Sequence, residues 1–344
     1  MLHSISLCTW RQLVRIKKVG SSQIKKFLPR RLLRGGHVQT VASFLLPRRI
    51  NLPAPEERMV EVEEGANVLC LCHWQDARHR ALTLIVVHGL EGSSDSQYMR
   101  GLTRKGLVAG MNVVRMNQRN CGGTEGISPT LYHSGRSYDV AAVAENLITR
   151  DGISRFALVG FSMGGNLVLK CAGEWGADPP AQLQAVAAVC PSMDPAASAD
   201  ALHLRSNRLY EMYFLWKLRG RFRAKAHLFP EAFDTSRLRG IRSLREFDDK
   251  ITAYYCGFDG ACDYYARAAA ANVIERISVP TLILHAANDP FIRILPETRK
   301  KISANPNIHF AESDDGGHCS FLANADGEDR HWAECRIIEF LTSS

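Results

Sequence analysis

Long hydrophobic runs are missing from this chain of 344 residues. No stretch approaches the roughly 20 uninterrupted apolar residues that a membrane-spanning helix needs, so the sequence predicts no such helix. No internal repeat or low-complexity segment is visible either. The composition is 46% hydrophobic and 23% charged, which is typical of a globular protein with one large domain or two. We therefore expect a substantial buried core.

Metal and nucleotide motifs are also missing. The ten cysteines contain no Cys-x-x-Cys pair, and no His-Glu-x-x-His occurs, so we expect no metal. Cys171 and Cys190 lie in apolar segments, as buried cysteines do in a reducing compartment, which predicts a cytoplasmic location. The glycine-bearing loop 117–124 lacks the spacing of a phosphate-binding or dinucleotide-binding loop. The sequence therefore predicts no cofactor.

Acidic residues are absent from residues 1–50, which hold eleven Lys and Arg, whereas the remainder carries 32 basic and 35 acidic residues. We interpret residues 1–55 as a basic N-terminal arm and lead-in. From the charge of this arm we predict peripheral contact with an anionic membrane, in which Trp10, Leu13, Val14 and Phe27 supply apolar contacts. A solvated extension is the alternative for residues 1–24. No nucleic-acid module accompanies the charge, so no nucleic-acid partner is expected. No feature indicates an oligomeric state.

Buried apolar runs alternate with amphipathic helical patterns from about residue 56. This alternation predicts an α/β fold, in which a mostly parallel central sheet has helices on both faces. The expected strands cover residues 59–63, 67–73, 82–87, 112–117, 156–159, 183–189, 281–284 and 308–312. The expected helices cover residues 96–109, 137–149, 164–175 and 332–341.

The alternation stops between residues 196 and 277, which are helix-like and rich in Arg and aromatic residues. We interpret 196–277 as a helical cap inserted before the last two strands, between the two parts of the core at 56–195 and 278–344. Its basic segment 217–225 is interpreted as a solvated face, because charge runs of this kind usually are.

The run Gly160-Phe161-Ser162-Met163-Gly164 joins an expected strand to an expected helix. A serine at such a junction lies on a tight turn that exposes its hydroxyl above the sheet edge, and the glycines permit the turn. We therefore predict Ser162 as a catalytic nucleophile.

A serine hydroxyl needs a base to remove its proton, and a histidine base needs a carboxylate to orient it. Asp289 and His318 follow the last two expected strands, in the order Ser, acid, His of sheet-based hydrolases. We predict them as the catalytic acid and base. Asp194, which follows the strand at 183–189, is the alternative acid. The histidines at 133, 285 and 309 have no comparable loop context.

The oxyanion of an acyl-transfer intermediate needs two backbone donors. We predict the amide of Met163 as the first and that of Leu90, in the glycine-bearing loop 88–94, as the second. His88 is expected to tie this loop together by hydrogen bonds, and loop 117–124 to shape the mouth of the site.

With these motifs in view, the chain resembles the α/β-hydrolase superfamily, and within it the YheT-like branch that also holds ABHD1- and ABHD3-type proteins and yeast medium-chain ester synthase/esterases. The resemblance is carried by five stretches, covers the chain from about residue 27, and implies that residues 27–50 are folded. Met163 stands where leucine is common in relatives, and only its amide is needed. The stretches are Arg34-Gly35-Gly36-His37-Val38-Gln39-Thr40, residues 88–94, residues 160–166, Phe247-Asp248-Asp249-Lys250-Ile251-Thr252, and Asp289-Pro290 with Gly316-Gly317-His318.

The resemblance implies hydrolysis of carboxylic esters with short-to-medium or lipid-like acyl groups, with Ser162, Asp289 and His318 as the triad. An acyltransferase or ester synthase with the same triad is the nearest alternative, and thioesterase or peptidase activity also remains open. A non-catalytic lipid-binding module would be expected to lose a triad member, and none is lost. The expected partner is a small-molecule or lipid ester.

Overall fold

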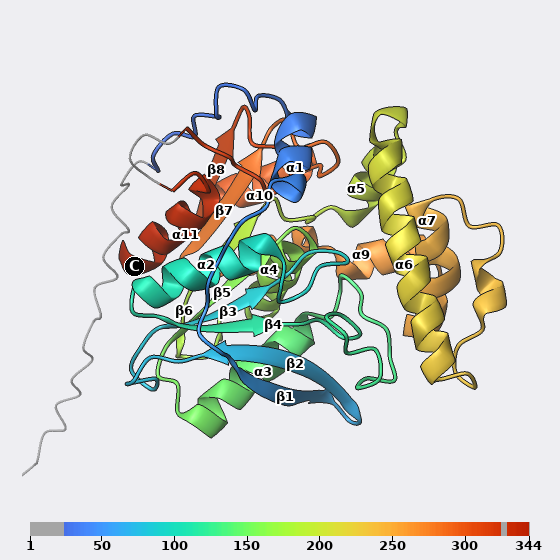
Figure 1. Ribbon diagram of the computed structural model, residues 1–344, viewed down its shortest axis with the longest axis horizontal. Coiled ribbons are helices and arrows are strands. Elements are labelled where there is room, and N and C mark those ends of the chain that lie inside the picture. Colours follow the sequence, from blue (N-terminus) through green and yellow to red (C-terminus); the bar gives the residue numbers. More distant parts are fainter. Residues whose placement is uncertain (1–23, 325–328, 344) are drawn as a thin grey trace, which may run out of the picture.

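The computed structural model describes residues 24–324 and 329–343, which are built around one eight-stranded sheet (Figure 1). The strand order is β1-β2-β4-β3-β5-β6-β7-β8. Strands β1 and β2 pair antiparallel, β2 pairs antiparallel with β4, and every later pair is parallel. The expected mostly parallel sheet is confirmed. The strands are β1 (Glu56–Glu63), β2 (Ala66–His73), β3 (Thr83–Val87), β4 (Asn112–Met116), β5 (Phe156–Phe161), β6 (Leu183–Val189), β7 (Thr281–Ala286) and β8 (Ile308–Ser313).

Helices cover both faces of this sheet. Successive side chains of a strand point to opposite faces, so in β3 Leu84 and Val86 pack toward α2 and α11, whereas Ile85 and Val87 pack toward α3 and α4. Because both faces are buried, the central strands read as continuous apolar runs. The flanking helices are α2 (Gln97–Val108), α3 (Ser137–Asp151), α4 (Met163–Trp175), α10 (Pro296–Ala304) and α11 (Trp332–Ser343).

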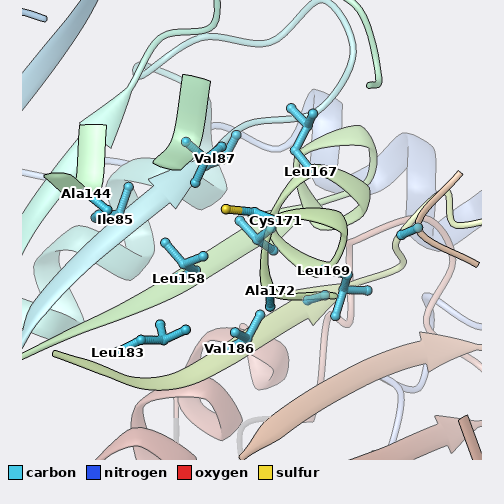
Figure 2. Packing of buried hydrophobic residues seen from close by; sticks show 14 of the residues in the cluster. Ile85, Val87, Ala144, Leu158, Leu167, Leu169, Cys171, Ala172, Leu183 and Val186 are labelled. Carbon is cyan, nitrogen blue, oxygen red and sulfur yellow. The ribbon is translucent and has the colours of Figure 1, made fainter. Parts of the chain in front are cut away.

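The core beneath α4 illustrates why this helix is apolar nearly all round. Figure 2 shows Leu167 and Cys171 of α4 packed over the strand residues Ile85, Val87 and Leu158. Each of these side chains is at most 2% exposed. A close-packed interior of this kind fixes the start of α4 relative to the end of β5.

The chain between β6 and β7 is helical, so the expected cap inserted before the last two strands is confirmed (Figure 1). It has an apolar interior of its own, which includes Leu215, Leu218 and Phe222 of α6. The elements are α5 (Pro195–Leu202), η1 (Arg205–Asn207), α6 (Arg208–Leu228), η2 (Thr235–Leu238), α7 (Leu244–Phe247), η3 (Asp248–Ala253), α8 (Tyr254–Cys256), α9 (Ala261–Ala268), η4 (Ala270–Asn272) and η5 (Ile274–Arg276).

The interpretation of segment 217–225 as a solvated face is wrong for two of its cations. Arg221 forms a bidentate ion pair with Glu91, at 2.8 and 3.1 Å, and bonds Glu125 at 3.0 Å. The Lys225 side chain is buried and donates to the carbonyl oxygens of Glu125 and Ser128. Both side chains point from α6 to the core. Burial of a cation is costly without partners of this kind, and these partners offset that cost.

The N-terminal arm is partly folded. Phe27 is buried against the rings of Phe321 and Trp332, at centroid distances of 5.4 and 5.6 Å, so the expectation that it contacts lipid is wrong. The helix α1 (Gly36–Leu45) follows it. Trp10, Leu13 and Val14 lie outside the described residues.

None of the helices in residues 24–324 and 329–343 combines the length and the apolar character that crossing a bilayer requires.

Candidate active site

Ser162 lies at the junction of β5 and α4, with backbone angles φ 55° and ψ −118°. A positive φ is rare for a residue with a side chain and costs about 1–3 kcal/mol. Close packing maintains it. A Cβ on Gly160 would lie 2.2 Å from the carbonyl oxygen of Gly164, and one on Gly164 would lie 2.3 Å from that of Val87. Only glycine fits at these two positions, which accounts for the sequence pattern around Ser162.

Three side chains from the ends of different strands meet here in one hydrogen-bonded series. The Nε2 atom of His318 lies 3.0 Å from Ser162 Oγ, and its Nδ1 atom lies 2.8 Å from Asp289 Oδ2. Ser162 follows β5, Asp289 follows β7 and His318 follows β8. An imidazole in this position can accept the serine proton through Nε2 while Nδ1–H donates to the carboxylate.

The Asp289 carboxylate is 2% exposed and is held by its own loop. Its Oδ1 atom accepts hydrogen bonds from the amides of Phe291 and Ile292, at 3.1 and 2.9 Å. Burial raises the pKa of Asp289, but the neighbouring His318 and the amide of Ile292 outweigh burial, so the net pKa lies below the ordinary value. The group is therefore ionised at neutral pH.

His318 lies in a turn against which α1 packs. The backbone amide of His318 donates to Thr40 Oγ1 at 2.9 Å. Gly317 has φ +60°, and a Cβ there would lie 2.5 Å from the carbonyl oxygen of Gly36 and 2.8 Å from Thr40 Oγ1. This contact explains the segment 34–40, to which sequence reasoning assigned no role: it supports the loop that carries His318.

Two thiols adjoin His318, and sequence reasoning missed both. Cys319 Sγ lies 3.9 Å from His318 Nε2, and Cys190 Sγ accepts from the amide of Cys319 at 3.4 Å. Burial raises the pKa of Cys319, but Cys190 and His318 lower it to about 6 overall. Burial lowers the pKa of His318, whereas Cys319 and Asp289 raise it, and the net shift is upward. No motif marks Cys190 or Cys319 as neighbours, since they are 129 residues apart.

Ligand atoms of Cys190, His318 and Cys319 all lie within 4.8 Å of one another, as do those of Cys190, His285 and Asp289. Thiolate and imidazole are ligands that Zn²⁺ prefers. Both groups reuse residues of the hydrogen-bonded series, so a metal bound at the first would compete with the Ser162–His318 contact and one bound at the second with the Asp289–His318 contact.

The loop after β3 lies against Ser162. A Cβ on Gly89 would lie 3.0 Å from Ser162 Cβ, and the side chain of Leu90 lines the same cavity as Ser162 and Met163. Met163 begins α4, so its amide is one of the first-turn donors that have no partner within the helix. Leu90 and Met163, whose amides are the expected oxyanion donors, therefore both line the cavity beside Ser162.

His88 ties this loop to the next one, as expected. Its Nδ1 atom lies 2.8 Å from the carbonyl oxygen of Gly89, and its Nε2 atom lies 3.1 Å from the amide nitrogen of Gln118. These contacts fit a neutral ring that donates from Nδ1 and accepts at Nε2. Burial lowers the pKa of His88 to about 4, which keeps it neutral.

The alternative acid, Asp194, is turned elsewhere. Its carboxylate accepts from the amide of Leu295 at 3.0 Å and from Thr298 Oγ1 at 2.8 Å, at the start of α10. His285 is buried, and burial lowers its pKa to about 4. Neither residue bonds to His318 or to Ser162, so the arrangement leaves Asp289 as the partner of His318.

A largely apolar cavity leads from Ser162 into the cap. It encloses about 970 Å³ of empty space, counting the open space at its mouth. Cap residues such as Phe214, Leu218 and Phe247 line it, and Asn120 of loop 117–124 lies in its wall. A concave and mostly apolar lining of this kind is typical of small-molecule pockets.

The segment 247–252 places a carboxylate in this apolar wall. Asp248 accepts from Tyr265 Oη at 2.7 Å and from Thr252 Oγ1 at 2.8 Å. Burial raises the pKa of Asp248 to about 6. The segment begins η3, a π-helical turn, and such turns are frequent at functional sites. Sequence reasoning recognised this segment as distinctive but could not place it beside the cavity.

Comparisons with known proteins agree with this architecture. The family model described as alpha/beta hydrolase fold matches residues 83–325. The YheT protein of Escherichia coli (strain K12), provisionally named an esterase, is 32% identical over 332 residues, covering 94% of each chain. Phospholipase ABHD3 of Mus musculus is 29% identical over 254 residues, which are 73% of this chain and 60% of that protein. The chain therefore spans less than two thirds of the phospholipase.

Solved structures share the fold at low sequence identity. The Pyrococcus furiosus esterase Pf2001 aligns with a TM-score of 0.54 and 16% identity, covering 86% of this chain and 98% of its own. Est1E from Butyrivibrio proteoclasticus, bound to ferulic acid, aligns with a TM-score of 0.55 and 15% identity, covering 83% and 98%. From the family match and the 32% identity to YheT, this chain belongs to the alpha/beta hydrolase fold family, in the branch that holds YheT and ABHD3.

Proposed function

We propose that this protein is a serine hydrolase that cleaves carboxylic esters through an acyl-serine intermediate. Ser162 is the nucleophile, His318 the general base and Asp289 the group that orients His318. The observation that carries the proposal is the pair of contacts made by His318, 3.0 Å to Ser162 Oγ and 2.8 Å to Asp289 Oδ2. The strained φ of 55° at Ser162 is further support, because strain of this kind collects at functional sites.

The reaction has two halves. Ser162 Oγ attacks the ester carbonyl carbon while its proton passes to His318 Nε2. The tetrahedral intermediate then expels the alcohol, which takes the proton from His318, and acyl-Ser162 remains. Water, deprotonated by His318, attacks the acyl carbon, and the carboxylic acid leaves as Ser162 regains its proton. The amides of Leu90 and Met163 stabilise the oxyanion in both halves, and one such donor contributes about 3 kcal/mol.

The substrate class in this proposal is an ester with a short-to-medium or lipid-like acyl group. The apolar cavity beside Ser162 supports it, since such a lining buries alkyl chains. The names of relatives also support it, because they include a phospholipase and a monoacylglycerol lipase. We propose that the cap, residues 196–277, selects the acyl group, and that residues 56–195 and 278–344 form the catalytic core behind the arm at 1–55.

Transfer to an alcohol is the second candidate function. A yeast relative, 27% identical over 294 residues, is named a medium-chain fatty acid ethyl ester synthase/esterase. Acyl-Ser162 is common to both reactions, and an alcohol that replaces water in the second half yields a new ester. A lipid-binding module without catalysis is less favoured, since the serine, acid and histidine are all retained.

The test is a series of p-nitrophenyl esters from acetate to palmitate, assayed with and without ethanol. The proposal predicts turnover with an optimum below palmitate, and loss of turnover by at least about 10⁴-fold in Ser162→Ala. Ser154→Ala, at the opposite end of β5, is the matched control and retains full activity. Retained turnover in Ser162→Ala would sink the proposal, and ethyl ester formation exceeding hydrolysis would favour the transferase.

The proposal also keeps a cytoplasmic location, with peripheral contact between the basic N-terminal arm and an anionic membrane. Cell fractionation checks it: the protein is expected in the cytosol and, at low salt, on membranes.

A further inference from the structure

An apolar surface outside the cavity is left uncovered by the fold. It is made by α1 with the residue after it, and by the outer side of α6; we refer to it as the α1–α6 patch. Phe44 is 65% exposed, Leu209 80% and Trp216 68%. These values are high for large apolar side chains, and contiguous exposure of this kind marks an interaction site. The patch consists of Val38, Val41, Phe44, Leu45, Leu46, Leu209, Met212, Tyr213 and Trp216.

The two helices form one continuous surface. The rings of Phe44 and Tyr213 lie 5.7 Å apart, and Tyr213 in turn lies 6.3 Å from Trp216. His37 Nδ1 lies 3.2 Å from Tyr210 Oη, with the two rings stacked. Segments that are more than 160 residues apart in the sequence are therefore side by side in the patch, the blue and yellow helices of Figure 1.

The helix α1 turns its polar side toward the protein and its apolar side outward, the reverse of an ordinary surface helix. Its polar residues Gln39, Thr40 and Ser43 face the protein, where they bond Leu322, His318 and Ser320. Its apolar residues face outward. An amphipathic helix normally buries its apolar side, so this orientation indicates that another apolar phase completes the burial.

The two segments that form the patch carry almost only positive charge. Residues 24–50 contain no acid, and residues 201–230 contain only Glu211, which is buried and bonded to His203 and to the amide of Leu244. Arg205 and Arg208 are exposed beside the patch, and neither forms an ion pair within the described residues. An apolar face fringed by unpaired cations is complementary to a bilayer with anionic headgroups.

From these observations we propose that the α1–α6 patch docks the protein onto an anionic lipid surface, with Phe44 and Trp216 inserted among the lipid chains. This binding does not depend on the proposed function. If both hold, the inner side of α6, where Phe214 and Leu218 line the cavity, lies next to the lipid from which an ester would be drawn.

Vesicle co-sedimentation of the full chain tests the proposal, with vesicles of phosphatidylcholine alone or mixed with phosphatidylglycerol. Binding is expected to the mixed vesicles, and salt is expected to weaken it. The double variant Phe44→Ser/Trp216→Ser is expected to bind at least tenfold more weakly. Val108→Ser, at an even more exposed apolar residue on α2, is the control and binds as wild type. Circular dichroism and hydrolysis of a soluble ester show that the variants are folded.

The charge is tested by Arg205→Glu/Arg208→Glu, for which weaker binding to mixed vesicles is expected, against Arg276→Glu in η5, which changes nothing. Failure of the wild type to bind, equal binding to both lipid mixtures, or unchanged binding of the Phe44→Ser/Trp216→Ser variant would overturn the proposal. So would light scattering that showed a wild-type dimer and a monomeric double variant without vesicles, because the patch would then bind a second copy.

Discussion

The residue on which the account depends most is Ser162, because its backbone strain and its proposed chemistry coincide. The glycines at 160 and 164 allow β5 and α4 to approach so closely that residue 162 must adopt φ 55°. Glycine would adopt this angle without strain, but it has no hydroxyl. Serine at position 162 therefore lowers the stability of the fold, but it places an Oγ atom where the proposed reaction needs it.

Replacing Ser162 should therefore separate stability from activity. Ser162→Gly is expected to be more stable than Ser162→Ala by about 1 kcal/mol, because only glycine relieves the strain, while both variants lack turnover. Urea unfolding followed by circular dichroism measures the difference. An alanine variant as stable as the glycine variant would show that the backbone at 162 is unstrained.

The pH dependence should follow His318. A neutral imidazole is needed to accept the serine proton, and Asp289 and Cys319 raise the pKa of His318 above its ordinary value of about 6.5 despite burial. We expect kcat/KM to fall as the pH drops through that raised pKa, so the acidic limb lies above pH ~6.5.

Cys319 contributes to the pH at which this acidic limb lies. The thiolate of Cys319 stabilises the imidazolium, so Cys319→Ser is expected to move the acidic limb to lower pH by removing the negative charge. Cys262→Ser, an exposed cysteine on α9, is the control and leaves the profile unchanged. An unshifted limb in Cys319→Ser would show that Cys319 is a neutral thiol in the working enzyme.

At the scale of elements, the helix α6 joins the cap to the loop that is proposed to stabilise the oxyanion. Arg221 of α6 holds both carboxylate oxygens of Glu91, the residue next to Leu90. The Glu91 side chain is 2% exposed, so without Arg221 it would be a buried charge with no cationic partner. Tyr132 also donates to Glu91 at 2.6 Å and completes this connection between cap, loop and core.

Arg221→Met is therefore expected to lower both stability and turnover. Loss of one partner of a buried pair costs about 3–5 kcal/mol, and a displaced Leu90 amide would lower kcat more than it raises KM. Adding Glu91→Gln should restore most of the stability, because the unpaired charge is gone, but not the full kcat. Thermal melts and ester hydrolysis of the single and double variants measure both effects. If the double variant is no more stable than Arg221→Met, charge burial is not the cause.

At the scale of the whole molecule, the parallel sheet gathers distant loops at one edge. The loops after β3, β5, β7 and β8 begin at positions 88, 162, 287 and 314, and all reach the same cavity or hydrogen-bonded series. The succession of strands along the chain, and the strand-end positions of Ser162, Asp289 and His318, can be predicted from the sequence, since buried strands and glycine turns have local signatures.

Other features depend on contacts that no local pattern encodes. The partners of Arg221 and Lys225 lie about 100 residues or more away, so this cationic segment reads as solvated although these two side chains bond to the core. The contact of Thr40 with His318 and the nearness of Cys190 to Cys319 arise in the same way. Phe27 reads as part of a basic arm, but it completes the core beside Phe321 and Trp332.

The central claim, that Ser162 is a nucleophile activated by His318, is tested most directly by covalent labelling. The native protein is treated with a fluorophosphonate, digested, and mapped by mass spectrometry. One adduct is predicted, on Ser162, and its rate of formation should fall by at least about 10³-fold in His318→Ala. An adduct on another residue, or an unchanged rate in His318→Ala, would contradict the account.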